Sequence, residues 1–152
     1  MMSPVLQLAC DVGGPLLGLD TSAQTASLVL VSPQAGSVQT RALDAASRPS
    51  EVVVASIAAL LQENGLDAAD LKALVVGLGP GSFTGLRVGL ATLKGMALGA
   101  RVPLFGVSSM EVLAAKAPPG PAVVVGDARR GDLYAALFDV GADGLPRRIL
   151  AE

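Results

Sequence analysis

Apolar residues recur along the chain with two spacings, and these spacings predict a regular order of strands and helices. Short apolar runs bounded by turn residues indicate strands, and because the first three are closely connected, they should pair as antiparallel neighbours. Apolar residues at helical spacing indicate the longer segments between later strands. The pattern predicts strands at 16–20, 26–31, 37–43, 73–77 and 103–107, and helices at 50–64, 82–100 and after Ser108 or Ser109. The predicted order is β-β-β-α-β-α-β-α.

A proline-rich segment at 117–121 predicts a boundary between two lobes. The first lobe is expected to span 16–117. The remainder, 118–152, is expected to be the start of a second lobe that stops early. Its expected strands form a β-meander at 122–127, 132–140 and 145–150 without a helix to cover them. Residues 1–15 contain only a short apolar part and no Lys or Arg, which favours a disordered leader over a targeting signal.

Each of the two long helices has an apolar face. On the helix at 50–64, an apolar arc that contains Val53, Val54, Ile57 and Leu61 has about the width that a surface helix buries. On the helix at 82–100, a bulky face formed by Leu86, Leu90, Leu93 and Ala97 is suited to covering a sheet. The other side carries Gly85, Val88, Gly89, Thr92, Gly95, Met96 and Gly99. Each interior glycine costs about 1 kcal/mol relative to alanine. We therefore expect another helix to approach this side closely, either from the same chain or from a partner.

Composition narrows the classes of function. The chain is 51% hydrophobic, which permits a substantial core, but no apolar run reaches the roughly 18 residues that span a bilayer. The net charge is −2 and the basic residues are scattered, so we expect no tight direct binding of nucleic acid and no membrane association. Cys10 is the single cysteine, which suits the reducing cytoplasm. The absence of histidine excludes a Ser-His-Asp triad and histidine-ligated zinc.

Two polar turns could hold a phosphate. Asp20 ends the first predicted strand and is followed by Thr21 and Ser22. Asp127 and Arg129 stand at a similar strand end in the second lobe, where the arginine could bind a phosphate or carboxylate. The alternative interpretation is structural: an Asx-turn closing a hairpin at the first position and an ordinary polar turn at the second.

A glycine-rich segment, LGPGSFTG, connects a predicted strand to the helix at 82–100. It lacks the Lys-Ser or Lys-Thr ending of a Walker A loop. Gly79, Gly81 and Gly85 form a loose variant of the dinucleotide fingerprint, but no acidic residue follows at the end of the next strand to bind a ribose. A tight structural turn that also serves an interface is the favoured interpretation, with a nucleotide-binding oxidoreductase as the alternative.

Four blocks taken together resemble the bacterial TsaB (YeaZ) family, the dimerisation subunit of the complex that makes threonylcarbamoyladenosine in tRNA. The blocks are LLGLDTSAQTASLVL, VVGLGPGSFTGLRVGLATLKGMALG, PLFGVSSMEVLAA and VVVGDARRGDLYAALF, and they cover about 16–140. The resemblance implies an α/β fold of the actin/Hsp70-like (ASKHA) type with two lobes, of which the first would be complete and the second shortened.

The resemblance also implies a non-catalytic scaffold or activator. Its partner would be a TsaD-type subunit, which transfers the threonylcarbamoyl group to an adenosine beside the anticodon, and a TsaE-type ATPase would join the assembly. Helices of the first lobe would form the interface, here 50–64 through Val53, Val54, Ile57 and Leu61 and 82–100 through its glycine-bearing side. The family can also self-associate as a homodimer. On this basis we expect no catalytic residue, no metal and no cofactor, and at most a vestigial nucleotide site at Asp20, Thr21, Ser22, Asp127 and Arg129.

The chain departs from the family in two ways. Pro49-Ser50 stands where members often have His-Ser at the start of the first helix, and the histidines that hold a metal in the catalytic relatives are absent. The chain is also shorter than expected for the second lobe. A self-sufficient ATPase or kinase of the actin-like class, using Asp20 and Asp127, is the alternative function.

Overall fold

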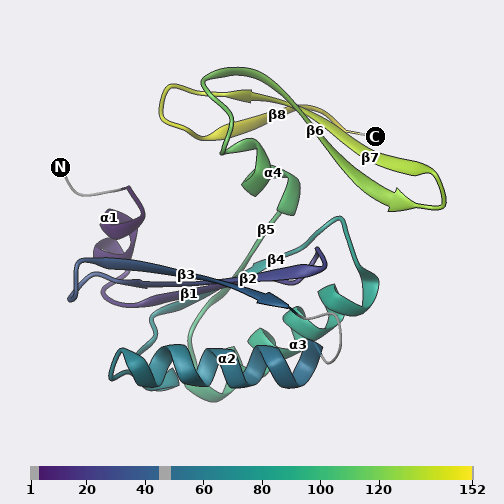
Figure 1. Cartoon of the computed structure of the whole chain (residues 1–152). Helices are drawn as coiled ribbons and strands as arrows, with labels where there is room; N and C mark the ends of the chain where they lie inside the picture. The colour runs from purple at the N-terminus through teal and green to yellow at the C-terminus, as the bar shows by residue number, and fades with distance from the viewer. Residues whose placement is uncertain (1–3, 45–48, 152) are drawn as a thin grey trace.

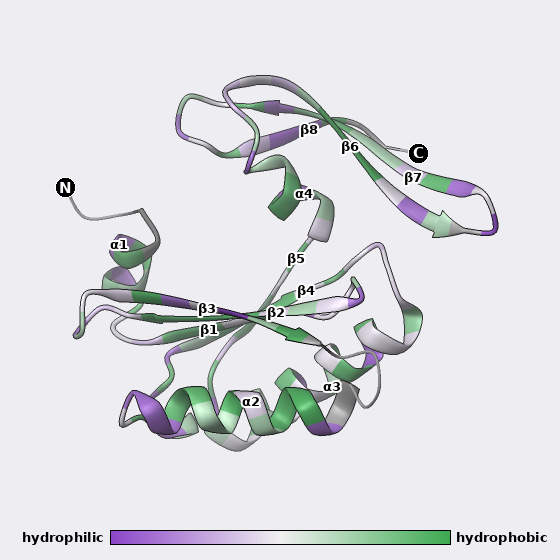
Figure 2. Cartoon of the chain, viewed as in Figure 1, coloured by the Kyte–Doolittle hydropathy of each residue, from purple (hydrophilic) through white to green (hydrophobic). Residues whose placement is uncertain are grey.

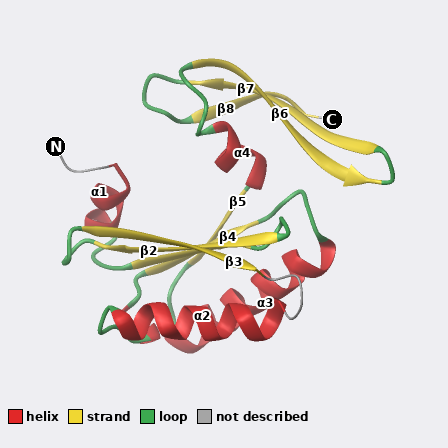
Figure 3. Ribbon diagram, in the orientation of Figure 1, coloured by secondary structure: helices red, strands yellow, loops and turns green. Residues whose placement is uncertain are grey.

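The computed structural model describes residues 4–44 and 49–151. The elements follow the predicted order closely, with one additional helix before the first strand (Figures 1 and 3). The helices are α1 (Pro4–Asp11), α2 (Pro49–Glu63), the 3-10 helix η1 (Ala68–Asp70), α3 (Phe83–Ala100) and α4 (Ser109–Ala114). The strands are β1 (Leu16–Asp20), β2 (Thr25–Ser32), β3 (Ser37–Asp44), β4 (Ala73–Gly77), β5 (Leu104–Val107), β6 (Gly120–Arg129), β7 (Asp132–Val140) and β8 (Pro146–Ala151).

Five strands form a mixed sheet in the order β3-β2-β1-β4-β5. The first three strands pair antiparallel, as their short connections predict. On the other edge of β1, the parallel strands β4 and β5 follow. Leu16 of β1 therefore lies between Val31 of β2 and Ala73 of β4. The central strand joins an antiparallel half and a parallel half.

Helices α2 and α3 lie side by side on one face of this sheet (Figure 1). Alternate residues of β1, Leu17 and Leu19, point into this helix-covered layer, where both are buried. The helices contribute the side chains Val53, Ile57 and Leu93 to the same core. Figure 2 shows the hydrophobic residues of α2 as green stretches of its ribbon. Aliphatic residues thus build the main core.

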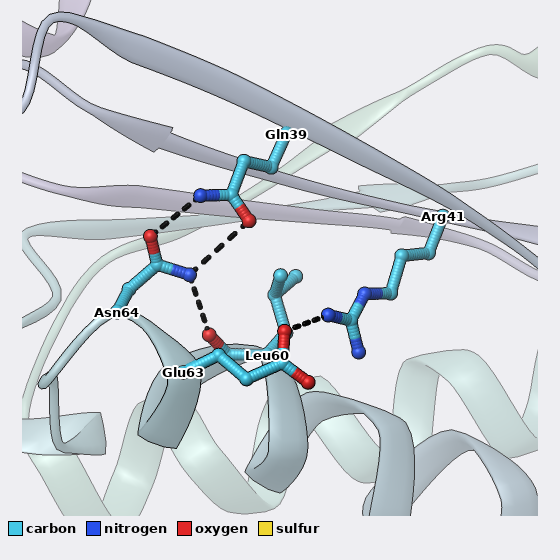
Figure 4. A network of polar contacts seen from close by, with 5 residues as sticks. All are labelled: Gln39, Arg41, Leu60, Glu63 and Asn64. Atoms are coloured by element: carbon cyan, nitrogen blue, oxygen red, sulfur yellow. Dashed lines mark hydrogen bonds and ion pairs between the residues drawn. The ribbon is translucent and has the colours of Figure 1, made fainter.

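Polar contacts also fasten α2 to the edge strand β3 (Figure 4). The side-chain amide of Asn64 donates to the Leu60 carbonyl at 2.8 Å and exchanges two hydrogen bonds with Gln39. The preceding residue, Glu63, forms an ion pair with Arg41 of the same strand. The C-terminal end of α2 is therefore held by side-chain bonds as well as by apolar packing.

The prediction of a disordered leader at 1–15 is wrong for Pro4–Asp11, which form α1. This helix packs on the opposite face of the main sheet from α2 and α3 (Figure 1). Its Ala9 is fully buried in a small cluster with Leu16, Val31 and Ala73. Because a helix this short is unstable alone, its packing on the sheet supplies the stability that its sequence lacks.

The strands after the proline-rich segment form a separate antiparallel sheet in the order β6-β7-β8. Contrary to the expectation that no helix covers it, α4 packs on one face, where Met110 and Ala114 contact Ala136 and Phe138. The pattern of residues predicted this helix as part of the first lobe, whereas its buried side chains pack against the second sheet. The boundary near residue 117 stays a prediction. In the described part of the chain, no helix combines the length and apolar character that crossing a bilayer requires.

Candidate functional site

The turn after β1 uses its polar groups within the protein. Asp20 accepts a hydrogen bond from the Ser22 backbone at 2.8 Å through Oδ1, which is the geometry of an Asx-turn. Thr21 is 2% exposed, and its hydroxyl donates to the Gly85 carbonyl at 2.7 Å. The Ser22 carbonyl accepts from the Ser82 backbone at 2.7 Å. These hydrogen bonds match the structural interpretation of this turn, in which Asp20 closes an Asx-turn.

The glycine-rich segment and α3 pack directly against this turn. A Cβ added to Gly81 would lie 2.3 Å from the Ser22 carbonyl oxygen, and one added to Gly85 would lie 2.1 Å from the Thr21 carbonyl oxygen. One turn further along α3, a Cβ on Gly89 would lie 2.3 Å from Thr21 Oγ1. These distances are well inside van der Waals contact, so a side chain at any of the three positions would displace the turn.

This packing corrects the expected role of two interface residues. Gly85 and Gly89 were predicted to face another helix, but both are buried against the β1–β2 turn of the same chain. In contrast, an added Cβ on Gly95 or Gly99 would meet nothing within 4 Å. The glycines of α3 therefore divide into a buried pair at its start and an exposed pair near its end.

The same glycine-rich segment contacts the start of α4. Its Gly79 amide donates to Ser109 Oγ at 3.1 Å, and the Ser109 amide donates back to the Gly79 carbonyl at 2.9 Å. Ser82 serves as the N-cap of α3, accepting from the Gly85 amide at 3.2 Å. The segment is thus a structural junction between the β1–β2 turn, α3 and α4.

The second candidate phosphate turn lies on the other sheet. Asp127 is exposed on β6 opposite Leu133, next to an irregularity in the β6–β7 register that involves Arg129. The side chain of Arg129 lies outside the described part of the structure. Arg130 and Gly131 close the hairpin with φ values of 57° and 90°, the conformation of a type I′ turn. Asp20 and Asp127 therefore belong to different sheets.

The predicted interface residues of α2 divide between core and surface. Val53, Ile57 and Leu61 are at most 5% exposed and belong to the main core, so the expectation that they form an outward surface is corrected. Val54 is 55% exposed. The arc seen in the sequence is therefore mainly the buried face of the helix, with Val54 at its outer edge.

An open groove of about 820 Å³ runs between α2 and α3. Three of the predicted interface residues of α3 line the groove, namely Thr92, Gly95 and Met96. On the α2 side Val54 lines it, and Ile57 and Leu61 form its floor. The residues that sequence reasoning missed here are Ala58, Gln62, Gly65, Leu66, Asp67, Ala68 and Ala91. Small side chains at helical spacing on both helices were the signal that could have found them.

Most of the lining of this groove is aliphatic or glycine, so it could accept an apolar helix from another protein. Within the described residues, no three His, Cys, Asp or Glu side chains gather closely enough to hold a metal ion. The groove can therefore bury apolar side chains of a partner, and the exposed backbone of Gly95 forms part of its wall.

Comparisons with known proteins agree on one group. The family described as "TsaD: tRNA N6-adenosine threonylcarbamoyltransferase" matches residues 43–147. The Escherichia coli (strain K12) "tRNA threonylcarbamoyladenosine biosynthesis protein TsaB" is 31% identical over 134 residues, covering 86% of this chain and 57% of that protein. The Bacillus subtilis (strain 168) protein of the same name is 36% identical over 85 residues, covering 55% of this chain and 37% of its own length.

Among solved structures, YeaZ from Pseudomonas aeruginosa superposes with a TM-score of 0.82 at 25% identity, covering 91% of this chain and 65% of that chain. This likeness, with the mixed α/β sheet, confirms the predicted actin-like α/β fold class. The chain spans only a little over half the length of the E. coli relative, so the similarity covers part of that protein.

Proposed function

Since this chain belongs to the family of TsaD-type tRNA N6-adenosine threonylcarbamoyltransferases, and is a TsaB (YeaZ) member of it, we propose that it acts in threonylcarbamoyladenosine biosynthesis as a non-catalytic subunit. It docks onto a TsaD-type catalytic subunit and supports that enzyme's work on tRNA. The names of its relatives are the reason for proposing this pathway. The proposal of a docking role rests on the structure of the first lobe.

The groove between α2 and α3 is the observation that carries the docking role. Its walls include the exposed side chain of Val54 and the bare backbone at Gly95, so a partner helix could lie close to α3 without meeting a side chain. Apolar burial in such a groove gains roughly 25 cal/mol for each Å² removed from water. The docking surface is therefore proposed as Val54 on α2 with Thr92, Gly95 and Met96 on α3, extending to the exposed Gly99.

The non-catalytic role is supported by the turn after β1. In a phosphotransfer enzyme of this architecture, the hydroxyl and amides of such a turn would be free to hold a phosphate. Here the Thr21 hydroxyl is buried and bonded to Gly85, while the Ser22 amide is bonded to Asp20. Binding a phosphate would require these bonds to break and α3 to move.

We further propose that a TsaE-type ATPase joins the assembly, that tRNA is held by the partner rather than by this chain, and that the complex works in the cytoplasm. A homodimer through the same groove is the competing use of the surface. Both occupants would bury the same residues, so they should exclude one another.

A matched pair of variants on α2 tests the docking role. Val54→Glu places a carboxylate in the apolar groove, which should weaken binding to the catalytic subunit from the same cell at least tenfold, about 1.4 kcal/mol. The control is Ala55→Glu, because Ala55 is the next residue, is also exposed, and does not line the groove. Titration calorimetry on both variants, after melting curves have shown that both are folded, gives the answer. Equal affinities for Val54→Glu, Ala55→Glu and the unmodified chain would refute this surface.

The alternative, a self-sufficient actin-like ATPase or kinase, is tested on the isolated chain. We expect negligible ATP turnover, no threonylcarbamoyl transfer and no peptidase activity. Multiple-turnover hydrolysis that survives purification and disappears in Asp20→Ala would overturn the non-catalytic assignment and leave the fold assignment intact.

A further inference from the structure

The main sheet and the second sheet are built around separate cores. Leu17 and Leu93 belong to the core that α2 and α3 cover, whereas Phe138 of the second sheet is buried against Met110 of α4. Among the described residues, the two clusters have no member in common. Units with their own cores move relative to one another by default, unless a large apolar interface holds them together. The contacts that join the two units therefore decide how freely the second sheet can turn.

The chain passes from one unit to the other without a linker. β5 ends at Val107, Ser108 is the N-cap of α4, and α4 begins at Ser109. Figure 1 shows α4 between the two sheets, with β5 leading directly into it. Because α4 packs on the second sheet through its own side chains, a rotation about the backbone of these residues would carry the second sheet with it. Residues 107–109 are therefore the pivot between the two units.

Ser109 fastens this pivot to the glycine-rich segment of the first lobe. The Ser109 amide donates to the Gly79 carbonyl at 2.9 Å, and the Ser109 hydroxyl oxygen accepts from the Gly79 amide at 3.1 Å. The two bonds run in opposite directions between the same pair of residues, so they fix its orientation as well as its separation. Ser109 is only 6% exposed, and a buried amide that loses its acceptor is costly. The pair is therefore expensive to open.

Gly79 is also held from the side of α3. Its φ of 82° lies in the left-handed region that favours glycine, and a Cβ added here would lie 2.9 Å from Leu86 Cδ1. Further along the same segment, the Ser82 amide donates to the Ser22 carbonyl, and the Ser82 hydroxyl caps α3. Gly79 thus lies between Ser109 of α4 and Leu86 of α3. A movement of one of these helices is felt by the other through this glycine.

We propose that the Gly79–Ser109 pair is a latch between the two units. While both bonds are made, the second sheet keeps one orientation relative to the main sheet. When they open, α4 and the second sheet turn together about residues 107–109. Because Gly79 packs on Leu86 of α3, and because coupling between two sites is reciprocal, a displacement of the glycine-rich segment frees the second sheet. This device belongs to the chain alone and does not depend on the docking role proposed above.

Two adjacent serines provide a matched pair of variants. Ser109→Ala removes the oxygen that accepts from the Gly79 amide, and Ser109→Thr keeps a hydroxyl at the same position. Ser108→Ala is the control, because the Ser108 hydroxyl makes only a long contact of 3.5 Å with the Gly79 carbonyl. Spin labels at Cys10 on α1 and at Asp132→Cys on β7, both exposed positions, report the distance between the two units in the full-length chain.

With the latch closed, the labels should give one narrow distribution of distances, measured by pulsed electron paramagnetic resonance. In Ser109→Ala we expect this distribution to widen, and the Gly79 amide to exchange with solvent about tenfold faster by NMR, because it has lost its acceptor. The amides of Leu17 and Phe138, one in each core, should stay protected. Ser108→Ala and Ser109→Thr should keep both the narrow distribution and the slow exchange of Gly79.

Four results would each overturn the latch. Faster exchange at Gly79 with an unchanged distribution in Ser109→Ala would mean that these bonds do not set the orientation. Loss of protection at Leu17 and Phe138 in the same variant would mean that Ser109 serves folding as a whole. A distribution as wide in Ser109→Thr as in Ser109→Ala would mean that the hydroxyl is not the fastening group. A wide distribution in the labelled chain without any serine substitution would mean that the pair stands open in solution.

Discussion

The two kinds of glycine on α3 make opposite predictions for one and the same substitution. Gly89→Ala places a methyl group 2.3 Å from Thr21 Oγ1 and 3.4 Å from Thr21 Cγ2. Gly95→Ala places it where nothing lies within 4 Å. Both changes replace an interior glycine of the same helix, so the intrinsic gain in helix propensity, about 1 kcal/mol, is common to both. Any difference between the variants reports the packing against Thr21.

The magnitude follows from the cost of moving the turn. Thr21 must withdraw by roughly 1 Å to reach ordinary contact distance, and overpacking of this kind costs about 1–3 kcal/mol. The movement also strains the bond from the buried Thr21 hydroxyl to the Gly85 carbonyl, and an unsatisfied buried group costs about 1–3 kcal/mol. After the propensity gain is subtracted, we expect Gly89→Ala to destabilise the fold by about 2 kcal/mol. Gly95→Ala should stabilise it by about 0.5–1 kcal/mol.

Thermal and urea denaturation of the purified chain measure both values. At about 3 °C for each kcal/mol, Gly89→Ala should lower Tm by about 6 °C, whereas Gly95→Ala should raise it by about 2 °C. Thr21→Ala provides the decisive background, because it removes Oγ1 and Cγ2 and leaves only the Cβ contact at 3.4 Å. Gly89→Ala should then cost almost nothing, which gives a coupling energy of about 2 kcal/mol in the double-mutant cycle. Equal effects of Gly89→Ala with and without Thr21 would refute the packing argument.

Two further predictions concern polar contacts, and one concerns the end of β4. Asn64→Ala removes the side chain that joins α2 to Gln39, so denaturation should show a loss of about 1 kcal/mol; an unchanged midpoint would mean that water replaces those bonds equally well. The Leu145 amide donates to the Asp143 carboxylate and lowers its pKa, with Arg147 adding to the effect. A lowered folded-state pKa means that the ionised carboxylate stabilises the fold at pH values above the unfolded-state pKa, and that this stabilisation is lost as the pH falls through the folded-state pKa. An NMR titration should therefore place the Asp143 midpoint below that of an unfolded peptide, and a midpoint equal to the peptide's would contradict this. Gly77→Ala would place a methyl 2.4 Å from the carboxyl carbon of Asp20 and should destabilise by about 1–3 kcal/mol, a prediction that an unchanged Tm would refute.

The element order could be predicted from the sequence because its signals are local. The spacing of Val53, Ile57 and Leu61 identified the buried face of α2, and Ser82 was visible as a helix start before the structure placed it as the N-cap. The antiparallel pairing of the first three strands followed from their short connections. The family resemblance, carried by the order of four sequence blocks, supplied the fold class.

The candidate site could be predicted only in part, because it depends on contacts between distant segments. Helical periodicity places the bulky residues of α3 toward the sheet, yet Leu90 is 38% exposed while Gly85 and Gly89 are buried. The reason is Thr21, whose carbonyl lies against Gly85 and whose side chain lies against Gly89, in the space that side chains would otherwise fill. The sequence of α3 alone does not show that Thr21 is its neighbour. Likewise Ala9 is buried because the sheet offers a place for α1, so its short, uncapped sequence gave no sign of order.

The position of β1 at the centre of the sheet has a consequence for how the chain is synthesised. β1 can pair with β2 as soon as the first hairpin has been made, but its other edge belongs to β4, and the whole of β2, β3 and α2 lies between them in the chain. During translation the apolar strand LLGLD therefore presents unpaired backbone groups until Ala73–Gly77 have emerged. An exposed apolar strand edge invites pairing with another chain. The interval before β4 arrives is thus the stage at which a newly made molecule depends most on chaperones or on fast synthesis to avoid aggregation.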